Sequence, residues 1–334
     1  MSSPPHTITP AILTLVAEIA AEVGRLGARS GQGKVPMLRR ENRIKSIHAS
    51  LAIENNTLSL EQVTAVIEGK RVLGKPSEIQ EVKNAFAAYE AMASWNPHSI
   101  KDLLAAHRLL MTALVDDAGR FRSRAVGVAK GNQVVHLAPP ADRVHGLTKD
   151  LLAWLKRTDS HPLVASSVFH YELEFIHPFA DGNGRMGRLW QTLILSRWNS
   201  LFAFLPVESV IRDRQADYYH VLGACDKAGN STAFIEFLLH ALLTALREVS
   251  TTDQVADQLT DQVKSLLKVL KKSPLSAIDC MARLKLSHRP TFRTNYLHPA
   301  LEQALIERPI PDKPNSRRQK YQLTEKGRTL LTDH

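Results

Sequence analysis

Residues 177–188 read His177-Pro178-Phe179-Ala180-Asp181-Gly182-Asn183-Gly184-Arg185-Met186-Gly187-Arg188. From Met186 to Ile194, apolar residues recur at i, i+3, i+4, i+7 and i+8, a spacing that predicts a buried helix. The turn Gly182-Asn183-Gly184 therefore lies at a helix N-terminus. Backbone N–H groups at such a position attract anions, and glycine lets a phosphate approach without obstruction by a Cβ atom. The stretch predicts a phosphate-binding turn.

The side chains of the same stretch supply groups for phosphate chemistry. His177 can accept a proton near neutral pH, and Asp181 offers the hard oxygen that Mg²⁺ prefers. Arg185 and Arg188 lie on one face of the first helical turn, so they can direct two guanidinium forks at one anion. The alternative is a helix start with a solvated basic edge. It does not account for a base, a metal ligand, a phosphate turn and paired arginines so close together.

These residues match every fixed position of the pattern His-Pro-Phe-x-Asp/Glu-Gly-Asn-Gly-Arg-x-x-Arg. The stretch resembles the signature loop of Fic-domain proteins, most of which transfer AMP from ATP to a hydroxyl group of a target protein. A pattern of this length is more specific than a lone glycine fingerprint. The resemblance implies a protein adenylyltransferase that uses ATP as co-substrate and Mg²⁺ as cofactor.

The resemblance also implies a role for each residue of the loop. His177 would be the general base for the attacking hydroxyl. Asp181 would hold Mg²⁺ on the α- and β-phosphates. Gly182, Asn183 and Gly184 would bind these phosphates through backbone N–H groups, and Asn183 would add a side-chain donor.

The two motif arginines would hold the outer phosphates, Arg185 the β-phosphate and Arg188 the γ-phosphate. A helix predicted over about residues 41–56 carries Ser50 and Glu54 on one face. Alone, that spacing indicates only a solvated helix face. Beside this motif it resembles the family's inhibitory helix, Ser/Thr-x-x-x-Glu-Gly/Asn, whose glutamate reaches the second motif arginine. The resemblance therefore implies that Glu54, with help from Ser50, inhibits the enzyme.

Residues 119–140 contain a change from helical to strand-like sequence. Two β-rich runs flank Gly131-Asn132, which predicts a hairpin. The alternative is a hairpin that only protrudes from the protein surface. The resemblance implies instead the family's flap, whose edge binds a segment of the target protein as an added strand and presents its Ser, Thr or Tyr hydroxyl. Self-modification is a further outcome that this arrangement allows.

Other polar residues stand out in the predicted helices. The adjacent tyrosines Tyr218 and Tyr219 ordinarily indicate packing, but the resemblance places one of them against the adenine ring. His107 lies on an apolar helix face, which favours a hydrogen-bonded core histidine over a catalytic one. His170 and Glu172 are interpreted as packing and surface groups.

The composition is that of an ordinary globular protein, with 334 residues, 44% hydrophobic and 23% charged. Cys225 and Cys280 lack ligand spacing, which favours a reducing compartment, here the cytoplasm, over a disulfide framework. We find no apolar run of membrane length and no signal peptide, so no membrane partner is expected. The 43 basic and 33 acidic side chains give a net charge of +10, which fits nucleic acid, a nucleotide or an acidic protein.

We expect an N-terminal helical region over residues 1–98, a catalytic core over 99–250 and a small domain over 251–334. The last resembles a winged helix, with a candidate recognition helix over 289–298 and a basic two-strand wing within 308–328. Such a surface could bind DNA or dock another protein, and the residues leave both open. The expected fold class is mainly α, a Fic helical core with a β-hairpin flap, plus this α+β domain.

Other functions remain open at this point. Some Fic proteins with this kind of glutamate remove AMP, and Glu54 would then position a water molecule. Other relatives transfer UMP or phosphocholine, and the branch that transfers phosphate departs from the Gly-Asn-Gly-Arg that this chain keeps. From a different class, the chain could be a DNA-binding regulator whose Fic core senses a nucleotide. The sequence identifies neither the target protein nor the oligomeric state.

Overall fold

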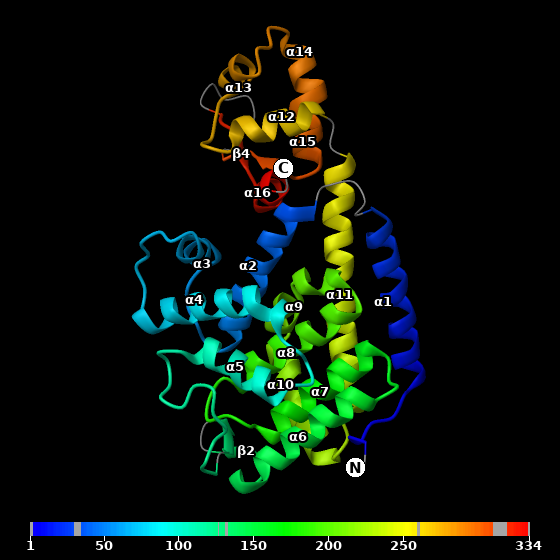
Figure 1. Ribbon diagram of the computed structural model, residues 1–334. Coiled ribbons are helices and arrows are strands. Elements are labelled where there is room, and N and C mark those ends of the chain that lie inside the picture. Colours follow the sequence, from blue (N-terminus) through cyan, green and yellow to red (C-terminus); the bar gives the residue numbers. More distant parts are fainter. Residues whose placement is uncertain are drawn as a thin grey trace. The chain divides into compact units, whose positions relative to one another are not determined.

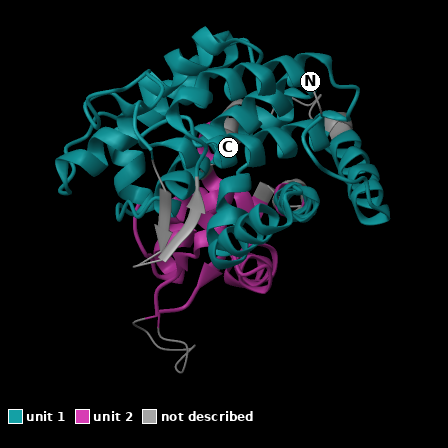
Figure 2. Ribbon diagram, turned by 90° about the horizontal axis from the view of Figure 1, so that it is seen from below, with its two compact units in different colours: residues 1–29, 42–247 teal, residues 30–41, 248–334 magenta. Residues whose placement is uncertain are grey.

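Helices make up most of the chain in the computed structural model (Figure 1). The structure describes residues 3–29, 35–125, 127–130, 133–258, 261–309 and 319–332. Within these ranges, strands form only two antiparallel pairs, so the predicted mainly α fold is confirmed. The chain divides into two compact units, residues 1–29 with 42–247 and residues 30–41 with 248–334 (Figure 2). In the described part of the chain, no helix combines the length and apolarity needed to cross a membrane.

The N-terminal part of the chain is helical, as predicted. It contains α1 (Pro10–Arg29), α2 (Val35–Ile53), α3 (Leu60–Ile67), α4 (Pro76–Ala91) and the short 3₁₀ helix η2 (Met92–Ser94). Helix α2 begins earlier than the predicted residue 41, since Pro36 lies in its first turn, where no backbone N–H is needed for an intrahelical bond. Ser59 and Gln62 form a capping box at the start of α3, which their three-residue spacing predicts.

Helix α8 (Asn183–Trp198), which follows the signature loop, packs against α7 (Pro162–Ile176) within the first unit (Figure 1). Met186, Leu189, Trp190 and Leu193 of α8 are fully buried, as their spacing predicts. Burial of each such side chain stabilises the fold by about 1.5–3 kcal/mol. The turn at 182–184 therefore lies at the start of a buried helix.

The remaining elements of the first unit surround this pair. They are α5 (Ile100–Met111), α6 (Ala141–Arg157), η3 (Ser200–Phe204), α9 (Val207–Asp213), α10 (Gln215–Ala228) and α11 (Thr232–Gln258), the last of which extends beyond residue 247. Ser99 caps α5 by accepting a hydrogen bond from the N–H of Asp102, as its position predicts.

The predicted hairpin is present as strands β1 (Gly127–Lys130) and β2 (Gln133–Leu137), which pair antiparallel. The register shifts between Val128 and Ala129, so the ladder contains a bulge or similar irregularity. The predicted turn residues Gly131 and Asn132 lie outside the described residues. Among the described residues, β1 and β2 pair only with each other.

The second unit has its own apolar core. Its described helices are α12 (Asp261–Leu270), α13 (Ala277–Arg283), α14 (Arg289–Phe292), the π-helical turn η4 (Arg293–Leu297), α15 (His298–Glu302) and α16 (Glu325–Thr332), with strands β3 (Ile306–Glu307) and β4 (Gln322–Leu323). The candidate recognition helix over 289–298 thus continues to Glu302. The predicted wing tip over 311–316 lies outside the described residues, so the winged-helix assignment stays a prediction.

Candidate active site

The signature loop joins the end of α7 to the start of α8 through two left-handed residues. His177 ends α7 with φ 49° and ψ 61°, and Gly182 precedes α8 with φ 83°. A Cβ atom on Gly182 would lie 2.7 Å from Sδ of Met111, so glycine is required there by both conformation and space. The loop places the histidine and the free N–H groups of the α8 N-terminus at the same end of the helix pair.

Asn183 closes the loop. Its Oδ1 accepts from the N–H of Phe179 at 2.9 Å, and its Nδ2 donates to the carbonyl of Phe179 at 2.9 Å. The side chain that we expected to face a phosphate is thus bonded to the loop backbone at both ends. Nδ2 has a second hydrogen, so the role of this side chain as a phosphate donor stays a prediction.

His107 holds the loop from α5, and its ring is buried as predicted for a core histidine. The N–H of Gly119 donates to His107 Nδ1 at 2.9 Å, so the proton is on Nε2, which donates to the carbonyl of Asp181 at 3.0 Å. The ring also stacks on Phe179 with a centroid distance of 3.7 Å. Burial lowers the pKa of His107, which keeps this neutral tautomer in place.

The ring of His177 contacts the backbone of α7. Its Nδ1 lies 3.4 Å from the carbonyl of Glu174, an acceptor that places the ring proton on Nδ1. Nε2 then carries the lone pair. The backbone carbonyl of His177 accepts from Nε of Arg122 at 2.7 Å, which fixes the position of the whole residue.

Arg122 is a residue whose role our sequence reasoning missed. It is buried, and its guanidinium donates to the backbone carbonyls of His177, Ile176, Arg124 and Pro139. Arg124 precedes the β1–β2 hairpin and Pro139 follows it, so one side chain ties both ends of the hairpin to the histidine. No local sequence pattern connects Arg122 to His177, so only the tertiary contacts reveal this role.

The structure brings Ser50 of α2 and Glu54, which directly follows α2, to Arg188 of α8, as the resemblance implied. Nη2 of Arg188 donates to Oε1 of Glu54 at 2.7 Å and to the carbonyl of Ser50 at 3.0 Å, while Nε donates to Oγ of Ser50 at 3.0 Å. The side chain of Arg188 is 1% exposed. Burial acts to lower the pKa of Arg188, but the carboxylate of Glu54 and other nearby acidic groups outweigh it and raise the pKa.

Glu54 also lies against the phosphate turn itself. A Cβ atom on Gly184 would be 2.6 Å from Oε1 of Glu54 and 3.1 Å from Nη1 of Arg188. The carboxylate therefore lies beside the N-terminus of α8, where free N–H groups and the helix dipole attract a negative charge. An anion that uses Arg188 at this helix end competes with Glu54.

Asp181 and Arg185 lie on the other side of the turn. Oδ1 of Asp181 accepts from the N–H of Gly182 at 2.5 Å and from Nη2 of Arg185 at 3.2 Å, and the carboxylate is 60% exposed. Mg²⁺ in nucleotide sites uses one or two carboxylates, water and substrate phosphates, so this open carboxylate fits the metal. In the described part of the chain, no group of three His, Cys, Asp or Glu side chains forms a dedicated metal cage.

The two candidate adenine-binding tyrosines differ in exposure. Tyr218 is 2% exposed, and its hydroxyl lies 3.2 Å from Nε2 of His170 among the rings of Phe234 and Phe237. Tyr219 is 44% exposed. Tyr218 thus packs in the core, and Tyr219 is the tyrosine of this pair whose ring faces solvent.

His170 is a packing residue, as predicted. It is buried, and burial lowers its pKa to about 3, so the ring is neutral at ordinary pH. Glu172 differs from the predicted surface group because it is partly buried. Burial first, and the charge of Asp226 second, raise the pKa of Glu172 to about 7.

Comparison with a solved structure decides the family. A Fic family protein from Desulfovibrio desulfuricans G20 is 61% identical to this chain, over 97% of this chain and 99% of that one, with a TM-score of 0.74. This chain belongs to the Fic family. The Fic/DOC family model matches residues 97–195. A second model, "Filamentation induced by cAMP protein Fic-like, C-terminal domain", matches residues 261–324.

Named relatives are more distant. The protein adenylyltransferase Fic of Nematostella vectensis is 33% identical over 220 residues, which are 62% of this chain and 49% of that protein. The protein adenylyltransferase fic-1 of Caenorhabditis elegans is 32% identical over 211 residues, 60% of this chain and 39% of that protein. This Fic chain thus spans half or less of the length of these curated relatives. A solved structure of Fic-1 from C. elegans, 24% identical with a TM-score of 0.61, shares the fold.

Proposed function

We propose that this Fic protein transfers AMP from ATP to a hydroxyl group of a protein, and that Glu54 holds it inactive. The observation that carries the proposal is the 2.7 Å contact between Arg188 and Glu54 beside the phosphate turn. A base, an open carboxylate, free N–H groups and two arginines converge on that turn. The relatives named protein adenylyltransferase support AMP as the transferred group.

In the proposed reaction, the hydroxyl oxygen attacks the α-phosphorus of ATP. A new O–P bond forms, the bond from the α-phosphorus to the α,β-bridging oxygen breaks, and pyrophosphate leaves with that electron pair. Nε2 of His177 takes the hydroxyl proton. The N–H of Gly182 donates to Asp181, so the N–H groups of 183 and 184 stabilise charge that develops on the α-phosphate, while Arg185 and Arg188 hold the β- and γ-phosphates in line.

Asp181 would hold Mg²⁺ together with the phosphates, and the metal would supply neutralisation of their charge. We propose that Tyr219, rather than the buried Tyr218, lies against adenine, because Tyr219 has the exposed ring. The target would add a strand to the β1–β2 hairpin, whose base Arg122 ties to His177. That tie would hold the added strand close to the base.

The test is transfer of labelled AMP from ATP to protein by the Glu54→Gly variant, with and without His177→Ala. Loss of the base should lower the rate by about 10²–10⁴ and leave nucleotide binding in place, because His177 acts on the hydroxyl. An undiminished rate would remove His177 from the mechanism. If Glu54→Gly instead loses an ability to release AMP from modified protein, the hydrolytic function is supported.

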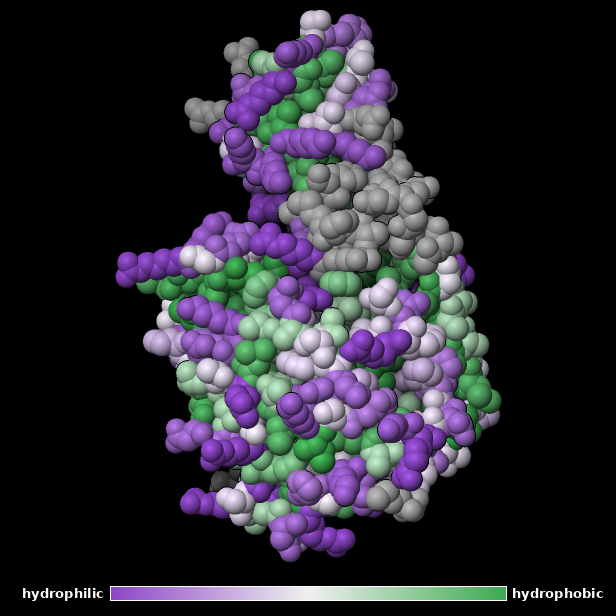
Figure 3. Space-filling model, in the orientation of Figure 1, coloured by the Kyte–Doolittle hydropathy of each residue, from purple (hydrophilic) through white to green (hydrophobic). Residues whose placement is uncertain are grey.

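A second function is supported by the exposed face of the second unit. Arg289, Arg293 and Asn295, on the helical stretch that begins at α14, are all exposed, as is Lys285 before it. The visible face of this unit carries both hydrophilic and hydrophobic side chains (Figure 3). We propose that the surface formed by Arg289, Arg293 and Asn295 binds the backbone of duplex DNA, as basic helices of small helical domains do.

The DNA proposal is tested by binding at increasing salt. Neutralising phosphates releases counterions, so affinity should fall steeply between low and physiological salt. Replacing both Arg289 and Arg293 by alanine should weaken binding and reduce the salt slope, whereas the same change at exposed Arg143 and Lys149 of α6 should not. Salt-independent binding, or none, would favour a protein-docking surface.

A further inference from the structure

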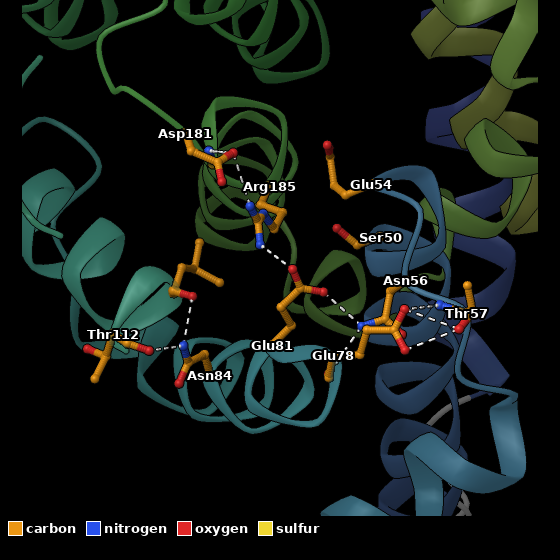
Figure 4. Close-up of polar contacts among 12 residues, drawn as sticks. Ser50, Glu54, Asn56, Thr57, Glu78, Glu81, Asn84, Thr112, Asp181 and Arg185 are labelled. Carbon is orange, nitrogen blue, oxygen red and sulfur yellow. Dashed lines mark hydrogen bonds and ion pairs between the residues drawn. The ribbon is translucent and has the colours of Figure 1, made fainter. Parts of the chain in front are cut away.

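The first motif arginine is held by a carboxylate from outside the motif (Figure 4). Nη1 of Arg185 donates to Oε1 of Glu81 in α4 at 3.3 Å, and Nη2 donates to Asp181 at 3.2 Å. The side chain of Arg185 is 6% exposed and that of Glu81 is 20% exposed. Solvent ions screen such a pair less than a surface pair, so the two carboxylates fix the guanidinium.

The second oxygen of Glu81 reaches the turn that ends the inhibitory helix. Oε2 of Glu81 accepts from Nδ2 of Asn56 at 2.8 Å. The amide of Asn56 also donates to the carbonyl of Glu78 at 3.1 Å and accepts from the N–H of Leu58 at 3.1 Å. Asn56 follows Glu54 closely in this turn. One carboxylate therefore joins Arg185 to the segment that carries the inhibitory glutamate.

We propose that Glu81 is a positioning residue for Arg185, and that it ties this arginine to the turn after Glu54. The proposal rests on the function proposed above. Asp181 cannot serve Arg185 and Mg²⁺ in full with the same oxygens. With Mg²⁺ bound, Asp181 would hold the metal, while Glu81 would still hold Nη1 of Arg185 and leave the other side of the guanidinium for the β-phosphate.

Because each carboxylate oxygen of Glu81 has a different partner, one substitution can test the bridge between them. Both oxygens accept hydrogen bonds, one from Arg185 and one from Asn56. Glutamine has the same shape but offers one acceptor and one donor group, so it can serve only one of the two partners. Glu81→Gln therefore breaks the bridge without creating a cavity.

Glu78 provides a matched control on the same helix. It is buried, and its carboxylate accepts from the N–H and hydroxyl of Thr57, in the same turn. Its other side-chain partner is Lys75 rather than a motif arginine. Glu78→Gln perturbs a buried carboxylate at the same turn but leaves Arg185 with its contacts.

The experiment uses the full chain with Glu54→Gly, so that the nucleotide does not compete with that carboxylate. The affinity for Mg-ATP is measured by calorimetric titration, KM and kcat by AMP transfer, and folding by circular dichroism. Adding Glu81→Gln should weaken binding and raise KM about tenfold, the value of one charge-assisted hydrogen bond. The effect on kcat should be smaller, and Glu78→Gln should resemble the parent.

A double-variant cycle shows whether Glu81 acts through Arg185. In a chain that also carries Arg185→Ala, Glu81→Gln should add no further loss of Mg-ATP affinity. Additive losses, or equal affinities of the Glu81→Gln and Glu78→Gln variants, would overturn the proposal. If the Glu54→Gly parent transfers no AMP, the proposed function fails, while the binding affinities still decide the role of Glu81.

Discussion

Replacing Glu54 by glycine should increase AMP transfer, and the structure sets the size of the increase. In the proposed reaction, the γ-phosphate displaces the Glu54 carboxylate from Arg188; these two side chains meet at 2.7 Å, and the side chain of Arg188 is 1% exposed. A hydrogen bond between charged groups contributes about 1.5–3 kcal/mol. Since 1.4 kcal/mol corresponds to a factor of ten, the rate of AMP transfer should rise about tenfold to hundredfold.

The same change has a second, independent consequence. Without Glu54, Arg188 keeps its bonds to Ser50 but loses the carboxylate that contacts it, so a buried cation is less well neutralised. Without bound nucleotide, the Glu54→Gly variant should therefore melt at a lower temperature than the parent. Mg-ATP should restore stability, because its γ-phosphate replaces the lost carboxylate. The rise in melting temperature on adding Mg-ATP should be larger in Glu54→Gly than in the parent.

The assay is incorporation of labelled AMP at saturating Mg-ATP, with a graded series of variants. Glu54→Gln keeps a neutral acceptor and should give an intermediate rate. Ser50→Ala removes one bond of Arg188 but leaves the bond to Glu54, so its effect should be smaller. Arg188→Ala in the Glu54→Gly chain should abolish the gain. Equal incorporation by the parent and Glu54→Gly would refute the reasoning.

Three predictions concern stability and folding. Arg122→Met should lower the free energy of unfolding by about 2–4 kcal/mol, because it leaves buried carbonyls without donors. A denaturant titration measures this free energy, and an unchanged value would contradict the role of Arg122. The pKa of Glu172 is raised from its ordinary 4.5 to about 7, so the folded state binds the proton more tightly and its stability should fall as pH rises through that window. Glu172→Gln should then stabilise the protein by about 1–3 kcal/mol at pH 8 and not at pH 4, which thermal melts at both pH values would check. Ending the chain at residue 251 should leave a folded helical core, because the later residues have a separate apolar cluster; loss of the helical circular dichroism signal would contradict this division.

The contiguous motif could be interpreted from the sequence because its physics is local. The apolar spacing after Met186 predicts a buried helix, and Gly182 is needed at a left-handed position that a side chain would strain. Helix period and turn chemistry act over a few residues. For the same reason the capping box at Ser59 was predictable. The Glu54 contact was anticipated only through resemblance to a family, since 134 positions separate it from Arg188.

Tertiary structure decided which side chains serve the site and which serve the core. Arg122 lies 55 positions from His177, and Glu81 lies 104 positions from Arg185, so no local pattern connects either pair. The two adjacent tyrosines are alike in sequence, yet packing buries Tyr218 and leaves the ring of Tyr219 in solvent. Local sequence determines helices and turns because their hydrogen bonds close within a few residues. The packing of those helices then decides which residues contact a buried charge.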